Sequence, residues 1–278
     1  MADAQPEQLY QSREPIHPRS VKGPFRTFKT GVLLLAYGVF FLLPWVRWER
    51  LAGPDQAVMF DIPTRRYFLF DLTVYPQDMY WLAGFLILAA WFLFFITGIF
   101  GRAFCGYFCF QTLWTDLFMK IEQLVQGERP ARMRLEKESW GLHKLTRKGL
   151  TWFLWIAVAF WTGFTFTAYW ANAPELFVDF FTGQAPFAAY VTTFLLTATT
   201  TVMAGFAREQ VCIYMCPYSR FQSVMFDKNT LIPTYDYNRG EGRSKPFKGL
   251  KTREEREEQG VGDCIDCGYC VQVCPTGI

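Results

Sequence analysis

Residues 79–109 read MYWLAGFLILAAWFLFFITGIFGRAFCGYFC, in which an uncharged stretch at 79–101 is followed at once by an arginine and two cysteines. About 20 consecutive apolar residues are enough to cross the hydrocarbon core of a bilayer as a helix. The stretch therefore predicts a membrane-spanning helix. Its two cysteines, Cys105 and Cys109, follow at the point where that helix leaves the bilayer.

Three further uncharged stretches have the same character and lie at residues 30–46, 149–174 and 180–207. The chain of 278 residues is 51% hydrophobic and 19% aromatic, which is unusual for a soluble domain. A buried helix of a soluble protein is the alternative for each stretch, and their length disfavours it. We predict an all-α integral membrane protein with four transmembrane helices arranged as two duplicated hairpins.

Lysine and arginine are sorted along the chain. Five precede the first predicted helix, nine lie at residues 102–148 and ten follow the fourth helix, whereas residues 47–78 hold four and residues 171–186 none. The positive-inside rule then places both ends in the cytoplasm, in a bacterial cytoplasmic membrane. The sorting of charge by membrane side and the net charge of only +3 disfavour nucleic acid as a partner.

A motif resembling that at Cys105 and Cys109 recurs 107 residues later. The sequence FGRAFCGYFC contains the first pair, and FAREQVCIYMC contains Cys212 and Cys216. Residues four apart share one face of a helix, so each pair presents two sulfurs in one direction. If the pairs meet, four thiols converge below the membrane and suit a soft ion such as Cu(I), or iron in a cluster; inert buried cysteines are the alternative.

An arginine precedes each pair, Arg102 in the first and Arg208 in the second. Either could lower the pKa of a nearby thiol, although anchoring at a membrane surface explains them equally well.

The strongest motif lies in residues 264–275, CIDCGYCVQVCP, with Cys264, Cys267, Cys270 and Cys274 in the spacing of a bacterial ferredoxin. It predicts a [4Fe-4S] cluster held by the first three cysteines. Cys274 then serves a second cluster, whose other ligands are expected beyond Ile278, so we interpret the chain as a fragment. Zinc modules need a partner pair about 12 to 20 residues away, and no such pair is near this run.

The predicted organisation has four parts. They are a cytoplasmic tail at 1–29, a membrane domain with both C-x3-C motifs at 30–216, a cytoplasmic linker at 217–258 and an incomplete ferredoxin domain at 259–278. Within them we expect an amphipathic surface helix at 112–125 and a solvated loop at 127–148. Haem is disfavoured because the two histidines, His17 and His143, lie outside every predicted span.

Several long strings resemble the CcoG family, also called FixG or RdxA, of membrane polyferredoxins linked to assembly of cbb3-type cytochrome oxidase. They are DLTVYPQDMYWL at 71–82, GRAFCGYFCFQTLWTDLFMKIE at 101–122, REQVCIYMCPYSRFQSVMFD at 208–227 and the terminal cysteine run. The resemblance implies two [4Fe-4S] clusters and a protein similar to a cupric reductase, with the C-x3-C pairs as the copper-handling residues.

Two departures from the family pattern stand out. Phe110 replaces a proline after Cys109, and the family's second cysteine run, further transmembrane helix and periplasmic immunoglobulin-like domain do not occur in these residues. The second departure also supports the interpretation of the chain as a fragment.

These features predict an oxidoreductase in the lipid bilayer that takes electrons from a cytoplasmic donor and reduces Cu(II) near Cys105, Cys109, Cys212 and Cys216. A quinol-linked electron conduit of the NapH or NosR type is one alternative. The other is a copper chaperone or scaffold without turnover, which would work with assembly factors of the cbb3 oxidase.

Overall fold

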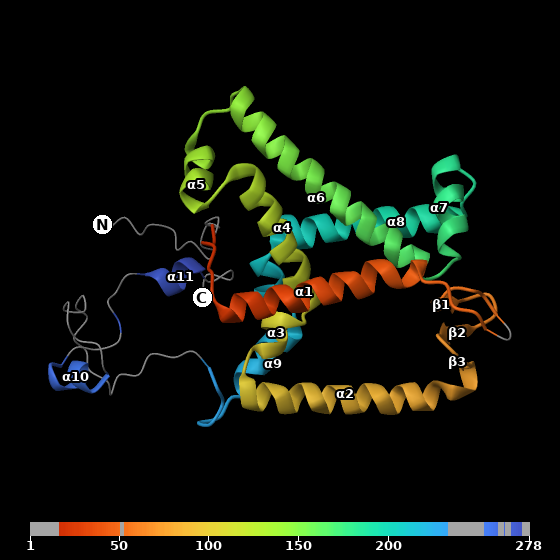
Figure 1. The fold of residues 1–278 in the computed structure, drawn as a ribbon, viewed down its shortest axis with the longest axis horizontal. Helices are drawn as coiled ribbons and strands as arrows, with labels where there is room; N and C mark the ends of the chain where they lie inside the picture. Colours follow the sequence, from red (N-terminus) through yellow and green to blue (C-terminus); the bar gives the residue numbers. More distant parts are fainter. Residues whose placement is uncertain (1–16, 51–52, 233–252, 261–263, 265–267, 274–278) are drawn as a thin grey trace, which may run out of the picture.

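The computed structural model describes residues 17–50, 53–232, 253–260, 264 and 268–273. Four helices in these residues are long and apolar enough to cross a membrane, which confirms the predicted number. They are, with their flanking turns, Pro24–Trp45, Pro76–Phe100, Leu142–Ala168 and Phe187–Ala207. Each contributes one crossing of a bundle in which successive crossings alternate in direction (Figure 1).

The helices of the described residues follow one another with short connections. Their bounds are α1 Pro24–Leu42, α2 Met79–Phe100, α3 Ala103–Tyr107, α4 Phe110–Gln126, α5 Arg129–Lys137, α6 Leu142–Ala168, α7 Ala173–Thr182, α8 Phe187–Thr200, α9 Pro217–Val224, α10 Arg253–Glu258 and α11 Tyr269–Val273. Two π-helical segments follow α8, namely η3 at Thr201–Ala207 and η4 at Val211–Met215. Short 3-10 turns at Leu43–Trp45 and Pro76–Asp78 flank α1 and α2.

The prediction of an all-α fold is wrong in one segment. Between the first two crossings the chain forms a three-stranded antiparallel sheet of β1 Val58–Asp61, β2 Arg66–Leu69 and β3 Leu72–Val74. The backbone N–H of Phe60 donates to the carbonyl of Tyr169 at 2.8 Å, which ties β1 to the end of α6. Strands of three or four residues are too short for a clear alternating pattern, so tertiary contacts decide them.

Helix boundaries also differ from the predicted spans where charged residues are involved. Helix α1 begins six residues earlier than expected and α6 seven residues earlier, so both include lysines and arginines. The predicted loop at 127–148 contains α5, and the predicted span at 149–174 ends at Ala168. Gly183 adopts the left-handed conformation, φ 82°, that terminates α7 and separates it from α8.

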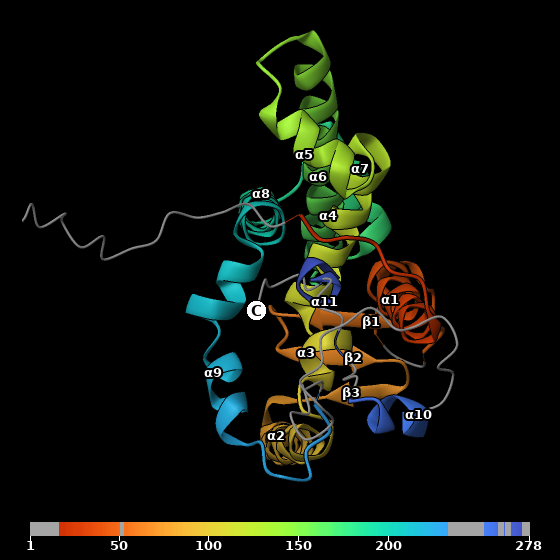
Figure 2. The same ribbon diagram turned by 90° about the vertical axis from the view of Figure 1, so that its left-hand side faces the viewer.

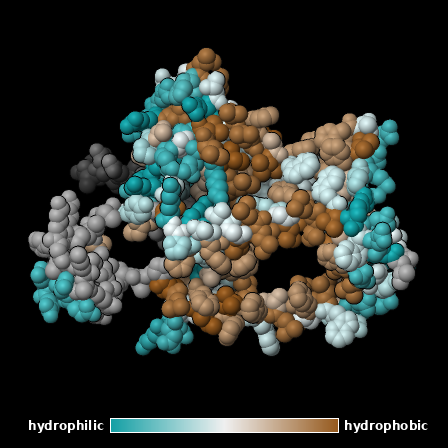
Figure 3. All heavy atoms as spheres, viewed as in Figure 1, coloured by the Kyte–Doolittle hydropathy of each residue, from teal (hydrophilic) through white to brown (hydrophobic). Residues whose placement is uncertain are grey.

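The segments rich in lysine and arginine lie together at one end of the bundle. We call this the thiol end, defined by residues 101–109 and 208–216; α3, α5 and α9 lie toward it, while the sheet and α7 lie at the opposite end (Figures 1 and 2). Apolar side chains cover much of the spans between these ends, and polar ones gather over α5 and around the sheet (Figure 3). This pattern fits a multi-pass membrane protein.

Helix α4 is part of the core, and this corrects its prediction as a surface helix. It crosses the other helices at a steep angle (Figure 1). Phe118 is fully buried and its ring stacks on that of Trp155 at 5.4 Å between centroids, and the Trp114 indole N–H donates to the Thr162 hydroxyl at 2.9 Å. The aromatic side chains of α4 thus join α1, α6 and η3 in one apolar cluster.

Helices α6 and α8 pack most closely at Gly163. A Cβ added there would lie 2.6 Å from the carbonyl oxygen of Thr193, a backbone atom that cannot move aside. We expect Gly163→Ala to lower the free energy of unfolding by about 1–3 kcal/mol through overpacking. Gly149→Ala in the same helix meets nothing within 4 Å and is the matched control, expected to be neutral or slightly stabilising. Thermal unfolding of both variants in detergent checks this; equal loss in both would contradict it.

Candidate metal centre

The two C-x3-C motifs adopt corresponding backbone conformations. Gly101, with φ 57° and ψ −116°, turns the chain after α2, and Arg208, with φ 34° and ψ −104°, does so after η3. The second cysteine of each pair is extended and directly precedes a helix, Cys109 before α4 and Cys216 before α9. All these positions are related by the 107-residue offset seen in the sequence.

The hydrogen bonds around the two motifs correspond as well. The N–H of Cys109 donates to the carbonyl of Phe104 at 3.0 Å, and that of Cys216 to the carbonyl of Val211 at 2.9 Å. Thr112 donates its hydroxyl to the carbonyl of Cys105, and Ser219 donates to that of Cys212. These bonds fix the backbone around each pair of thiols independently of any metal.

Side chains from each motif's helix reach across to the other motif. Gln111 of α4 donates from Nε2 to the carbonyl of Met203 at 2.8 Å. In return, Gln222 of α9 donates from Nε2 to the carbonyl of Gly101 at 3.4 Å, and the hydroxyl of Tyr218 hydrogen-bonds to that of Thr97. The two motifs therefore face each other at the thiol end.

A buried ion cluster holds the second motif against α4. Glu122 receives the guanidinium of Arg208 at 3.0 Å and that of Arg132 at 3.3 Å. The three side chains are nearly buried, with 11%, 12% and 4% of their surfaces exposed, respectively. Removing the carboxylate would leave two nearly buried guanidinium groups without an anion, which strongly destabilises a fold. The cluster therefore fixes the position of the chain just before Cys212.

The four membrane-proximal thiols influence one another electrostatically. The pKa of Cys105 is raised to about 11, mainly by burial and also by the charges of Cys109, Cys216 and Cys212, while a hydrogen bond to Gln222 acts in the opposite direction. Burial likewise raises the pKa of Cys212, with added repulsion from Cys109 and Cys216. The structure thus brings the four predicted cysteines into one neighbourhood.

Arg102 acts on the pKa of Cys212 in the expected direction, but burial has the larger effect. Arg208 is engaged by Glu122 and by the carbonyl of Gly205. Cys105 and Cys212 are therefore protonated near neutral pH, and a metal ion that binds them must displace their protons.

No group of three or more histidine, cysteine or acidic side chains is arranged to hold a metal ion within the part of the chain that the structure describes. The four thiols are near one another without forming a closed cage. A metal ion bound by all four would have to draw them together.

The terminal cysteine run is described in part. Cys264 is partly buried, Cys270 is exposed on α11, and Cys267 and Cys274 lie outside the described residues. Gly268 adopts a left-handed conformation, φ 62°, which allows a tight turn next to Cys270. The run supplies four thiols, and thiolates are the usual ligands of iron in a cluster, so these residues fit a [4Fe-4S] group.

Helix α11 is attached to the segment that leads into α1. The N–H of Arg19 donates to the carbonyl of Gln272 at 2.8 Å, and the Arg19 guanidinium lies 4.9 Å from the ring centroid of Tyr269. Helix α11 thus lies at the thiol end, on the same side of the bundle as the two C-x3-C motifs.

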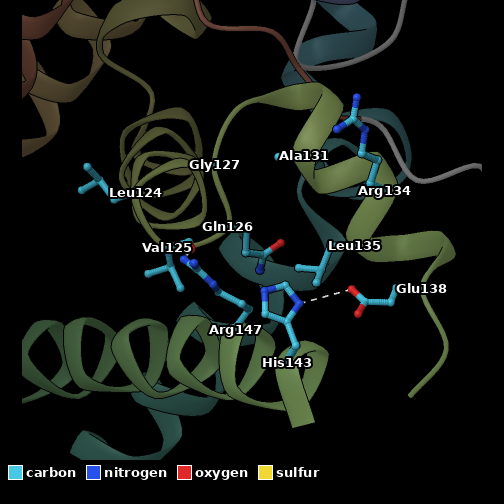
Figure 4. A pocket seen from close by; sticks show the side chains of 10 residues that line it. All are labelled: Leu124, Val125, Gln126, Gly127, Ala131, Arg134, Leu135, Glu138, His143 and Arg147. Atoms are coloured by element: carbon cyan, nitrogen blue, oxygen red, sulfur yellow. Dashed lines mark hydrogen bonds and ion pairs between the residues drawn. The ribbon is translucent and has the colours of Figure 1, made fainter. Parts of the chain in front are cut away.

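Of the two histidines, His143 lines a cavity that is separate from the C-x3-C motifs. His143 lies beside a cavity of about 410 Å³ between α4, α5 and α6, where its Nδ1 contacts Glu138 at 3.3 Å (Figure 4). The lining of this cavity contains no cysteine. His143 is exposed and lies in the first turn of α6, within the candidate span Leu142–Ala168. Its predicted place outside every span is therefore wrong, because α6 begins seven residues earlier than expected.

Sequence reasoning missed Gln111, Gln222 and Glu122 as residues that position the site. A signal existed for one of them: Glu122 is a charged residue on the face of α4 that carries Trp114 and Phe118. A charge on an apolar helix face indicates a buried partner.

Comparison with known protein families supports iron at both cysteine regions. Residues 80–129 match a 4Fe-4S binding domain, and residues 207–278 match a 4Fe-4S dicluster domain. The first match contains Cys105 and Cys109; the second contains Cys212, Cys216 and the terminal run. With the four candidate spans, these matches define a multi-pass membrane iron–sulfur protein.

Curated relatives extend over nearly the whole chain. Protein RdxB of Cereibacter sphaeroides is 45% identical over 99% of this chain, and protein RdxA of the same organism is 45% identical over 98%. The nitrogen fixation protein FixG of Rhizobium meliloti is 44% identical over 97%. The chain belongs to the FixG/RdxA family, as its motifs indicated.

The matched part covers 57%, 56% and 51% of RdxB, RdxA and FixG, so the chain spans about half the length of these relatives. No solved structure matches the chain.

Proposed function

We propose that this iron–sulfur protein transfers single electrons to Cu(II) at the four membrane-proximal thiols and releases Cu(I) for the assembly of a cbb3-type cytochrome oxidase. The observation that carries the proposal is the facing of the two C-x3-C motifs across Gln111 and Gln222, with their thiols in mutual electrostatic reach. Copper is the substrate in this proposal.

The membrane domain is proposed to be an internal duplication of a helix hairpin. The matching backbone turns at Gly101 and Arg208 support it, as do the corresponding hydrogen bonds of Thr112 and Ser219. Gln111 of the first half contacts η3 of the second half, and Tyr218, the corresponding residue of the second half, contacts α2 of the first. An approximate two-fold relation between the halves requires such reciprocal contacts.

The proposed iron–sulfur ligands are Cys264, Cys267 and Cys270 for one cluster and Cys274 for a second. A bound [4Fe-4S] group supplies one-electron redox chemistry. The electron comes from a cytoplasmic donor, and Arg19 contributes by holding α11 at the thiol end of the bundle.

The thiols act by their preference for the reduced ion. Each copper ion gains one electron, Cu(II) + e⁻ → Cu(I), and the soft thiolates of Cys105, Cys109, Cys212 and Cys216 stabilise the product more than the substrate. Burial keeps Cys105 and Cys212 protonated until the ion arrives, and those protons leave to water at the thiol end.

We propose a bacterial cytoplasmic membrane with the thiol end in the cytoplasm. Lysines and arginines are concentrated in the segments at that end, as the positive-inside rule requires for a cytoplasmic face. A reducing compartment also keeps the eight cysteines available as ligands.

A quinol-linked conduit is the second candidate, and the match of residues 80–129 to a 4Fe-4S binding domain favours it, because iron would then occupy the first C-x3-C pair.

Anaerobic metal analysis and stopped-flow kinetics of the full-length protein separate the two candidate functions. We expect pre-reduced protein to convert Cu(II) to Cu(I), measured with a Cu(I)-specific chelator, as its iron–sulfur absorbance returns to the oxidised form. Reduction by a quinol with no response to Cu(II) would favour the conduit, and stoichiometric copper binding without reduction would favour a chaperone.

A further inference from the structure

A positively charged cavity lies where α1 begins, apart from the C-x3-C motifs. Its volume is about 480 Å³, and residues 18–22, the start of α1, α4 and the start of α5 line it. Six cationic side chains face two carboxylates in its lining. The cations are Arg19, Lys22, Arg26, Lys29, Lys120 and Arg132, and the carboxylates are Asp116 and Glu128.

Three of the six cations share a single buried carboxylate. Asp116 is 3% exposed and receives Arg26 in a two-pronged contact at 2.8 and 3.0 Å. Lys29 lies 3.8 Å and Lys120 4.0 Å from the same carboxylate. Three cations on one anion leave an excess of positive charge, which an additional anion in the cavity would balance.

Two further features leave donors available to such an anion. Arg132, 4% exposed, lines the cavity; its terminal nitrogens bond Glu122 and the carbonyl of Pro18, while its buried Nε has no hydrogen-bond partner among the described residues. Helix α1, 19 residues long, begins after Gly23 with no side-chain cap and no acidic residue in its first turn. A helix N-terminus favours an anion through its free N–H groups and its dipole.

The apolar neighbours of these cations indicate which anion is bound. Phe25 and Phe28 alternate with Arg26 and Lys29 in the first turns of α1, and their exposed fractions are 78% and 62%. Helix α1 is itself a candidate membrane span. A phosphate of a lipid at the membrane surface can contact the cations while its acyl chains cover the two rings, whereas free phosphate would leave the rings uncovered.

We propose that this cavity binds the phosphate headgroup of an anionic phospholipid. Bound lipid would be close to the redox region, because Phe28 packs edge-on against Tyr107, between Cys105 and Cys109, at 5.5 Å between centroids. Arg19, which also lines the cavity, holds α11. An anionic lipid in the cavity thus stabilises the thiol end from the membrane side.

The test measures lipid binding to delipidated, detergent-solubilised protein by native mass spectrometry. The probes are dioleoylphosphatidylglycerol, dioleoylphosphatidylcholine and inorganic phosphate. We expect phosphatidylglycerol to bind most tightly. The exposed lysines allow a variant that keeps the fold: Lys22→Gln with Lys120→Gln should weaken phosphatidylglycerol binding by about 25-fold, about fivefold for each charge.

Lys137→Gln is the matched control, since it removes the same charge from an exposed position on α5 outside the cavity, and it should leave binding unchanged. Circular dichroism checks that each variant is folded. Equal binding of both lipids, equal loss in the control, or competition by inorganic phosphate at equal concentration would each overturn the proposal. The proposal would also be overturned if the cavity bound neither lipid and its lysines were needed only for binding of a soluble acidic ferredoxin.

Discussion

Replacing Cys212 and Cys216 together by serine is expected to reduce the rate of Cu(II) reduction at least about 100-fold, because a hydroxyl is a hard, protonated ligand that holds Cu(I) poorly. The iron–sulfur spectrum should persist, since Cys264, Cys267 and Cys270 are untouched. The measurements are stopped-flow formation of the Cu(I)–chelator complex and the electron paramagnetic resonance signal of the reduced protein.

Two controls give this experiment its meaning. Tyr214 lies between the two cysteines with 72% of its surface exposed, so Tyr214→Phe changes the same turn without removing a thiol and should retain activity. Cys270→Ser removes a proposed cluster ligand and should remove both the signal and the activity. If Cys212→Ser/Cys216→Ser loses the iron–sulfur signal instead, these cysteines hold iron, as the match of residues 207–278 to a dicluster domain permits.

Glu122→Gln should lower the free energy of unfolding by about 3–5 kcal/mol, because it leaves two nearly buried guanidiniums, those of Arg132 and Arg208, without their carboxylate. For a protein of this size the apparent melting temperature should fall by about 10 °C. Arg208 precedes Cys212, so the variant should also loosen the second C-x3-C motif. Thermal unfolding in detergent, followed by fluorescence, measures the change.

Glu138→Gln is the matched control for Glu122. Glu138 makes an ion pair with His143 at 3.3 Å, but 43% and 64% of the two side chains are exposed, and exposed pairs contribute about 0–1 kcal/mol. A melting temperature that changes equally in the two variants would contradict the assigned role of the Glu122 cluster.

The membrane-spanning helices could be predicted because hydropathy alone carries the information. Residues 79–101 contain no charge, and α2 occupies Met79–Phe100 almost to the residue. The starts of α1 and α6 could not be predicted, because each contains a charged residue whose partners only the fold supplies. Arg26 in α1 is paired with the distant Asp116, and Lys144 in α6 donates to the carbonyl groups of Glu136 and Glu138. The sheet was missed for a similar reason, since its short strands depend on Phe68 being buried.

The candidate site could be predicted as residues but not as an arrangement. The C-x3-C repeat identified Cys105, Cys109, Cys212 and Cys216, and their proximity followed from the assumed symmetry of two hairpins. Gln222, 1% exposed, showed no motif, and its role depends on α9 lying beneath the end of α2. The net rise in the pKa of Cys212 could not be predicted, because it depends on burial, which outweighs the lowering by Arg102.

The sequence by itself determined that this chain crosses a membrane four times and carries thiols in two kinds of motif, because hydropathy and cysteine spacing are local properties of the chain. Only the tertiary structure decided that the two C-x3-C motifs face each other, that α4 lies in the core and that an excess of positive charge surrounds Asp116. Those features depend on contacts between residues 37 to 121 positions apart, which no local pattern records.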